Sequence, residues 1–315
     1  MTTDVRARAV PSTRSAPAEQ RPQRRRIRRE HLIFLAFILP DAAIILIFAY
    51  WPILYNAFLS LTRWDLVAPR PEFVGLKNYV DIFTDTRFLG PLWQTAVFTI
   101  GVVGLSIVLG VLIAVLLNQK IPGRGIARTV IFAPYVLPGA AAATIWLMMY
   151  DPNHGVSRWL FGLIGMASPN WMNDSHFALI GLIIVYTWKH TGFCAIVYLS
   201  ALQGLPQDQY EAADLDGAGP VKKFFSLTLP FLSPTTFFLL VTTTIATFQA
   251  FDIIATMTGG GPARSTTTLS WYIYQEGFET FNMGYAAAGA IVMFVILLII
   301  TAVQSAYVGR RVHYQ

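Results

Sequence analysis

The sequence has little charge and almost no cysteine. Only 13% of its 315 residues are Asp, Glu, Lys or Arg, whereas 55% are hydrophobic. In soluble domains roughly a quarter of the residues are charged, so this composition excludes an ordinary soluble protein and predicts a polytopic membrane protein. Cys194 is the only cysteine and lies in an apolar stretch, which excludes an internal disulfide and a cysteine-based metal site.

Motifs for catalysis and nucleotide binding are missing as well. The sequence contains no Gly-x-x-x-x-Gly-Lys-Ser/Thr segment, so it has no P-loop that could bind the phosphates of ATP. It also lacks His-Glu-x-x-His, Gly-x-Ser-x-Gly and any paired-carboxylate constellation. We therefore predict no catalytic residue, no metal site and no cofactor in this chain.

The positive charge belongs mainly to one tail. Nine arginines lie in the first 29 residues, although the whole chain has a net charge of only +6. Because residues 1–30 mix Pro, Ser, Ala and Arg without an apolar period, we predict a disordered basic tail there and a membrane domain over 31–315. This distribution argues against a nucleic-acid partner. The arginines either contact anionic lipid headgroups or act only as a topology signal.

Long apolar runs predict an all-α membrane protein with six spans. A span needs about 20 mostly apolar residues. The predicted spans are 32–58, 92–117, 127–149, 177–202, 231–256 and 284–308. The excess of Lys and Arg on the side of the N-terminal tail predicts that both termini are cytoplasmic and that 151–175 and 257–283 are external. The expected location is the inner or plasma membrane of the cell.

A polar stretch at about 203–230 interrupts the apolar second half of the chain. Pro206 and Pro220 suit the first turns of two short helices, and Asp216-Gly217 is a turn signal because glycine adopts positive φ without strain. The pattern predicts two short helices at an angle between two spans. An amphipathic connector or a soluble helix-turn-helix is the alternative interpretation.

This stretch resembles the EAA motif of the permease subunits of ABC importers. The residues in register are Glu211, Ala212, Ala213, Asp216, Gly217, Ala218, Phe224, Leu229 and Pro230, and Leu227 stands where Ile is usual. The resemblance implies a type I importer permease whose EAA loop binds an ATPase. It also implies four kinds of partner: a second homologous permease, two ATP-binding subunits, an extracytoplasmic substrate-binding protein and the lipid bilayer.

Two further stretches resemble the carbohydrate-uptake, maltose-permease-like branch of this family. They are residues 73–79 before the second predicted span and the segment from Phe251 to Pro262, in which the fifth predicted span ends. The C-terminal residues, including 266–269 and 311–315, look like those of permeases for glycerol phosphate and glycerophosphodiesters. That resemblance implies such a substrate. A di- or oligosaccharide such as trehalose or maltose is the alternative.

Polar side chains on two predicted spans suggest the substrate path. Tyr186, His190 and Phe193 share one helix face with Lys189 beside them, and Thr243, Thr247 and Ala250 repeat the same spacing. Both faces resemble the sugar-contacting faces of maltose-type permeases. A lysine and a histidine inside a span are costly unless they face a partner or water, so they are candidates for substrate binding. In the alternative interpretation Lys189 has a structural partner, either a backbone carbonyl or Asp252.

Two other classes of protein remain open on the sequence. A polytopic membrane enzyme requires acidic or histidine groups clustered at one membrane face, and no such cluster is evident. A secondary transporter often shows two similar halves, and no convincing repeat is present.

Overall fold

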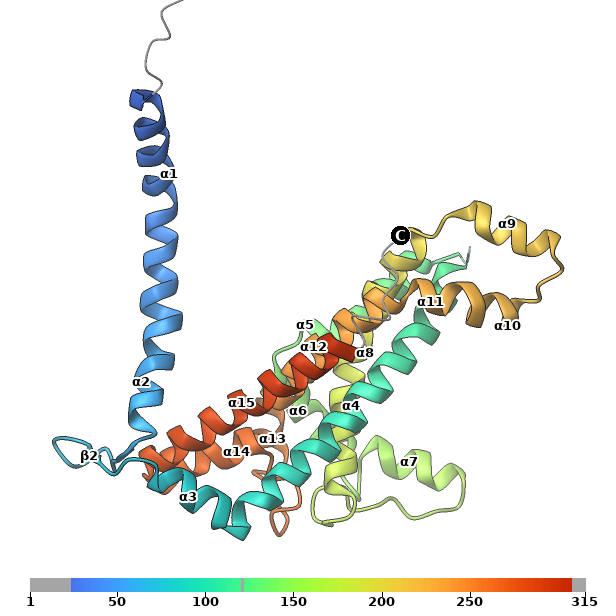
Figure 1. The fold of residues 1–315 in the computed structure, drawn as a ribbon. Coiled ribbons are helices and arrows are strands. Elements are labelled where there is room, and N and C mark those ends of the chain that lie inside the picture. The colour runs from blue at the N-terminus through green and yellow to red at the C-terminus, as the bar shows by residue number, and fades with distance from the viewer. Residues whose placement is uncertain (1–23, 120–121, 308–315) are drawn as a thin grey trace, which may run out of the picture. The chain divides into compact units, whose positions relative to one another are not determined.

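The computed structural model of the protein describes residues 24–119 and 122–307 (Figure 1). The chain divides into two compact units, Met1–Leu54 and Tyr55–Gln315. The first unit is helical throughout its described part and comprises α1 (Arg24–Ile45), the π-helical turn η1 (Leu46–Tyr50) and the start of α2 (Trp51–Leu59). The π-helical turn ends two residues before Pro52, which has no N–H and whose ring crowds the preceding turn.

These helices make one candidate span, His31–Leu59, in agreement with the predicted span 32–58. Residues 1–23 of the predicted tail lie outside the described residues. Helix α1 begins at Arg24, within the range 1–30 of the predicted tail.

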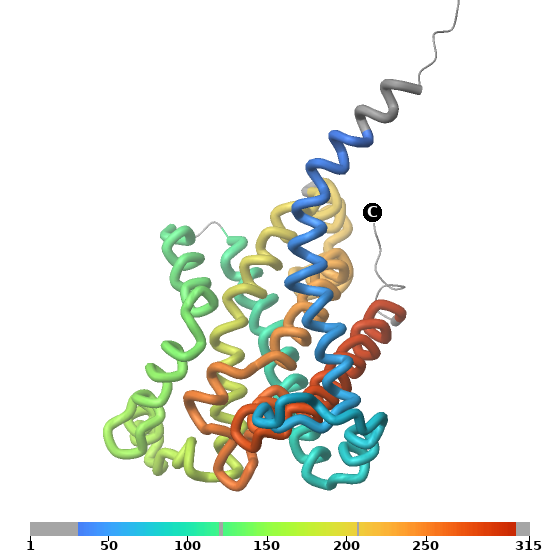
Figure 2. Tube along the Cα trace, turned by 90° about the vertical axis from the view of Figure 1, so that its left-hand side faces the viewer, coloured from blue at the N-terminus to red at the C-terminus, as the bar shows by residue number. Residues whose placement is uncertain are grey.

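The second unit is a bundle of long helices with shorter helices at both ends (Figures 1 and 2). Its first half contains the strands β1 (Thr62–Arg63) and β2 (Glu72–Phe73) and the helices α3 (Lys77–Thr84), α4 (Thr86–Asn118), α5 (Arg124–Val136), α6 (Gly139–Met149), α7 (Val156–Leu163) and α8 (Ala178–Gln203). Its second half contains α9 (Gln207–Leu215), α10 (Pro220–Lys223), η2 (Phe224–Thr228), α11 (Leu229–Phe231), α12 (Ser233–Phe248), α13 (Asp252–Met257), α14 (Leu269–Tyr274), η3 (Gln275–Glu279) and α15 (Met283–Tyr307).

Helices α4 and α8 form the centre of this bundle. Phe98 of α4 meets Tyr186 of α8 edge to face, with ring centroids 5.0 Å apart. Further along the pair, a Cβ at Gly110 would lie 2.6 Å from the Cβ of Cys194, so the helices approach too closely there for any side chain. Small residues at such crossings allow the close backbone packing on which helix association in membranes depends.

Two predicted spans differ from the structure. The span predicted at 127–149 is broken into α5 and α6, which make an angle of 103°. The span predicted at 231–256 ends at Phe248, and α13 begins separately at Asp252. It is also preceded by a 62° bend between Pro220–Phe231 and Ser233–Phe248. Prolines surround both bends, and proline removes a helix hydrogen bond and clashes with the turn before it. The described residues therefore contain four candidate spans, or up to six if each bent pair is one span.

A short hairpin stands at the end of the bundle that also carries α3 and α7 (Figures 1 and 2). Its strands pair antiparallel, with Thr62 opposite Phe73. The buried amide of Asn78 donates to the carbonyls of Ser60 and Thr62, both at 2.8 Å. A Cβ at Gly284 would lie 1.8 Å from the Thr62 carbonyl oxygen, so the start of α15 packs directly on the hairpin. The 73–79 stretch thus joins the hairpin to the last span at what we call the hairpin end.

Candidate functional site

Helices α9 and α10 form a helical hairpin at the other end of the bundle, opposite the hairpin end (Figures 1 and 2). The chain reverses at Gly217, whose φ of 71° is the left-handed conformation predicted from the Asp-Gly turn. The Gly217 amide donates to the Asp214 carbonyl at 3.1 Å, and the Ala218 amide donates to Ala213 at 2.9 Å. Of the six predicted coupling residues, Glu211, Ala212 and Ala213 lie on α9, and Asp216, Gly217 and Ala218 form the turn.

Two side-chain contacts fix this helical hairpin to itself and to the bundle. Lys223 of α10 pairs with Asp214 of α9 at 2.5 Å. The hydroxyls of Tyr210 and Thr228 are also 2.5 Å apart. A cavity of about 420 Å³ lies between the helical hairpin and the last turns of α4 and α8, where Asn118 and Leu202 line it. The helical hairpin therefore lies next to the ends of α4 and α8.

The outer side of the helical hairpin exposes large apolar side chains. Leu215 is 90% exposed, Val221 69% and Phe225 62%. Clustered apolar side chains of this kind on an otherwise polar loop indicate a protein-binding surface.

The predicted face of α8 carries an aromatic cluster. The rings of Tyr186 and His190 stack at 5.3 Å. Tyr135 of α5 stacks on Phe193 at 4.7 Å and meets His190 edge to face at 5.9 Å. The structure thus brings the three predicted residues into one cluster, and His190 and Phe193 both contact Tyr135, which the sequence analysis did not select.

His190 has one ring nitrogen committed to the backbone. Its Nδ1 lies 3.0 Å from the carbonyl oxygen of Tyr186. Because a carbonyl only accepts, Nδ1 carries the hydrogen in the neutral ring and Nε2 is left as an acceptor. His190 is mostly buried, with 8% of its surface exposed.

The ammonium group of Lys189 contacts the backbone where α5 ends. It donates to the carbonyl oxygens of Pro134 at 3.5 Å, of Tyr135 at 3.2 Å and of Leu137. The backbone-carbonyl alternative for Lys189 is therefore the arrangement in the structure. Among the described residues, Lys189 and Asp252 form no direct ion pair.

The predicted face of α12 lies inside the chain's own core. Thr243 and Thr247 lie on α12, whereas Ala250 lies two residues past its end, and all three are at most 2% exposed. Thr247 donates to the Thr244 carbonyl at 2.9 Å, and Thr243 lies 4.0 Å from the sulfur of Cys194. These three residues pack in the interior of the bundle, whereas Lys189 and Phe193 of α8 are half-buried.

Asp252 is a functional candidate that helix-face spacing could not select. Asp252 is exposed. Its Oδ1 accepts hydrogen bonds from the Ile253 amide at 2.9 Å and from the Tyr186 hydroxyl at 3.5 Å. A Cβ at Gly139 would lie 1.6 Å from Oδ2 of Asp252, so the carboxylate covers the first residue of α6. The sequence signal that could have identified Asp252 is its position as an acidic residue at the end of a long apolar run.

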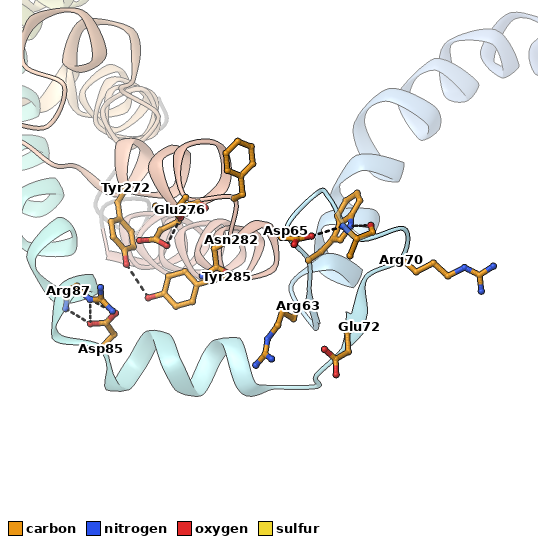
Figure 3. Close-up of a pocket in the computed structure, with 14 residues that line it drawn as sticks. Arg63, Asp65, Arg70, Glu72, Asp85, Arg87, Tyr272, Glu276, Asn282 and Tyr285 are labelled. Atoms are coloured by element: carbon orange, nitrogen blue, oxygen red, sulfur yellow. Dashed lines mark hydrogen bonds and ion pairs between the residues drawn. The ribbon is translucent and has the colours of Figure 1, made fainter.

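A separate cavity of about 640 Å³ opens at the hairpin end (Figure 3). The hydroxyls of Tyr272 and Tyr285 meet at 3.3 Å on one side, near Glu276. Asp85 pairs with Arg87 at 3.1 Å, and the Arg87 backbone amide, together with the guanidinium, holds the pKa of Asp85 below its usual value. The cavity therefore combines aromatic rings with charges of both signs.

Comparison with known proteins places this architecture in a class. Residues 106–314 match the family of binding-protein-dependent transport system inner membrane components. The chain belongs to this family, and it is a multi-pass membrane permease subunit of an ABC importer. The helical bundle and the absence of a P-loop agree with this class, in which ATP hydrolysis takes place on a separate subunit.

Two groups of relatives are similar over most of the chain. The sn-glycerol-3-phosphate transport system permease protein UgpA of Yersinia pestis is 34% identical over 279 residues, covering 88% of this chain and 94% of the relative. The trehalose/maltose transport system permease protein MalF of Thermococcus litoralis is 34% identical over 275 residues, covering 87% and 93%.

Solved structures show the same fold. A chain of a bacterial ABC transporter that imports the acidic polysaccharide alginate is 25% identical, with a TM-score of 0.76 over 91% of this chain and 98% of that one. A chain of the alginate transporter in complex with an alginate pentasaccharide-bound periplasmic protein gives a TM-score of 0.77 at 23% identity, over 90% and 95%.

Proposed function

We propose that this chain spans the membrane six times and couples ATP hydrolysis on other subunits to substrate import. In this topology each bent helix pair crosses once, and both termini and the α9–α10 hairpin lie in the cytoplasm. The charge distribution supports this orientation, since the basic tail, Lys222 and Lys223 all fall on one side.

The geometry of the α9–α10 helical hairpin is the observation that supports the coupling role. Residues in register with the EAA motif form a turn with a left-handed glycine, and exposed apolar side chains flank that turn. An ATPase subunit binds this surface. The Lys223–Asp214 pair holds α9 and α10 together, and Tyr210 passes their movement to Thr228. The assembly contains two such subunits and a second homologous permease.

The substrate arrives on an extracytoplasmic binding protein. The family description, a binding-protein-dependent transport system, supports this partner. We assign its docking side to the hairpin end, where the cavity lined by Asp65, Arg87 and Glu276 offers charges of both signs. Complementary charge patterns set the register and speed of such encounters.

We assign a glycerol phosphate or a glycerophosphodiester as substrate. The 34% identity to a UgpA permease over 88% of the chain supports this assignment. The equal identity to a trehalose/maltose permease supports a di- or oligosaccharide as the second candidate. Nε2 of neutral His190, an acceptor, suits a hydroxyl group, which both classes of substrate offer.

Purification of the tagged chain from its native membrane tests the class of protein. An ATPase subunit and a second permease should co-purify with it. Ligand screening of the associated binding protein against sn-glycerol 3-phosphate, glycerophosphodiesters, trehalose and maltose then separates the two substrates. A chain that purifies alone, or with no ATPase under any mild detergent, would refute the proposed assembly.

A further inference from the structure

The break between α5 and α6 leaves backbone carbonyls without helix partners. Leu137 and Pro138 are extended, with ψ of 138° at both residues. Pro138 has no N–H, so the Pro134 carbonyl has no donor four residues on. The 103° bend removes the other bonds of the last turn. At membrane depth such groups need hydrogen-bond partners, because lipid offers none.

Lys189 supplies those partners. An ammonium group has three N–H donors and no acceptor. Its three hydrogen bonds go to three carbonyl oxygens at the break, those of Pro134, Tyr135 and Leu137. The positive charge also lies at the negative, C-terminal end of α5. One side chain on α8 therefore satisfies the broken end of a neighbouring span.

A second charge of opposite sign lies on the other side of the break. The Asp252 carboxylate covers Gly139, the first residue of α6, at the positive end of that helix. The Tyr186 hydroxyl donates to the same carboxylate, and Tyr186 lies one turn from Lys189 on α8. Helix α8 thus contacts both sides of the break, directly at α5 and through Asp252 at α6.

We propose that Lys189 and Asp252 are positioning residues that hold the α5–α6 break in a fixed bend during transport, and that neither is a ligand for the substrate. Lys189 fixes the end of α5, and Asp252 fixes the start of α6. The aromatic cluster of Tyr135, His190 and Phe193 adjoins the break, so a fixed bend keeps these rings in place.

Uptake kinetics of the full complex in proteoliposomes, with its binding protein, test this assignment. Lys189→Met keeps the length of the side chain and removes the three donors, so the maximal rate should fall by at least about tenfold. The half-saturating concentration of the loaded binding protein should not change. Lys189→Arg, which retains N–H donors and charge, should restore part of the rate. The control Lys77→Met, on an exposed residue of α3, should transport normally.

A pair of substitutions tests the role of Asp252 at the start of α6. This test remains possible even if the Lys189 variants are poorly expressed. Gly139→Ala adds a methyl group where Asp252 now lies, so it should reduce the maximal rate. Asp252→Ala makes room for that methyl, so the double variant should be no worse than Asp252→Ala alone. Gly90→Ala in α4, where a Cβ meets no atom within 4 Å, is the control.

Three results would overturn the proposal. The first is a raised half-saturating concentration at an unchanged maximal rate in Lys189→Met, which would make Lys189 a substrate ligand. The second is wild-type transport in both Lys189→Met and Gly139→Ala. The third is strict additivity of Gly139→Ala and Asp252→Ala, which would show that the two sites do not contact each other in the working protein.

Discussion

The ammonium nitrogen of Lys189 lies 3.2 Å from the carbonyl oxygen of Tyr135, where α5 ends and the chain turns toward α6. The most conspicuous charge within the predicted substrate path therefore serves the backbone of a neighbouring helix. His190, one residue further along α8, has its Nε2 available and stacks on Tyr186. The two adjacent residues should consequently give different phenotypes, a rate defect at Lys189 and an affinity defect at His190.

Substitution of Gly217 should impair coupling to the ATPase. Gly217 has a φ of 71°, and a Cβ there would meet no atom within 4 Å, so only backbone strain opposes a side chain. Gly217→Val should cost about 1–2 kcal/mol in this turn. We expect lower uptake and weaker co-purification of the ATPase subunit, with membrane insertion unchanged.

Gly219→Ala is the matched control for that variant. Gly219 also has open space around it, but its φ of −65° is one that any residue adopts. The control should behave like the wild-type chain. Normal uptake and normal co-purification in Gly217→Val would remove the α9–α10 turn from the coupling pathway.

The exposed apolar side chains of the α9–α10 hairpin should be required for ATPase binding. Leu215 is 90% exposed, so Leu215→Asp should leave the fold of the bundle intact. A buried charge at the interface should reduce co-purification by at least about tenfold. Val67→Asp, on a residue 81% exposed at the hairpin end, should have no such effect. Equal retention of the ATPase by both variants would place its binding site elsewhere.

The α9–α10 hairpin was predictable because its signals are local. Pro206, Gly217 and Pro220 each dictate backbone conformation within a few residues, and the structure has the predicted turn and both short helices. The break in the third span was not predictable in this way. Hydropathy is continuous across 127–149, and a proline in a span often leaves the helix intact, as Pro40 in α1 and Pro91 in α4 show.

The candidate site was predictable only in part. Helical spacing correctly grouped Tyr186, His190 and Phe193, because residues three and four apart share a face. Spacing does not reveal which neighbour packs against a face, so Tyr135 was missed and the burial of Thr247 was not foreseen.

The substrate path is tested by alanine substitutions on the two faces. His190→Ala should lower uptake while the complex still assembles and retains basal ATPase activity. Loss of one hydrogen bond of about 0.5–1.5 kcal/mol corresponds to a change of roughly two- to tenfold in apparent affinity. Thr247→Ala should leave the apparent affinity unchanged, because the Thr247 hydroxyl is buried and donates to the Thr244 carbonyl. Thr242→Ala, on the same helix but bonded to the Phe238 carbonyl, is the control. If His190→Ala imports with unchanged affinity and rate, the path does not follow this face of α8.

The topology can be measured by cysteine labelling. Cys194 is fully buried, and Cys194→Ser provides a background without cysteine. A cysteine introduced at Arg264 should react with an impermeant reagent in intact cells, because 257–283 is predicted to be external. Labelling that appears only after the membrane is opened would reverse the proposed orientation.

The most direct test of the account is uptake by proteoliposomes that contain this chain with its second permease and ATPase, and its loaded binding protein outside. We predict import of sn-glycerol 3-phosphate that requires ATP inside the vesicles and is strongly reduced by Gly217→Val. Import that proceeds without ATP, driven by an ion gradient, would contradict the assignment of this chain as an ATP-driven permease.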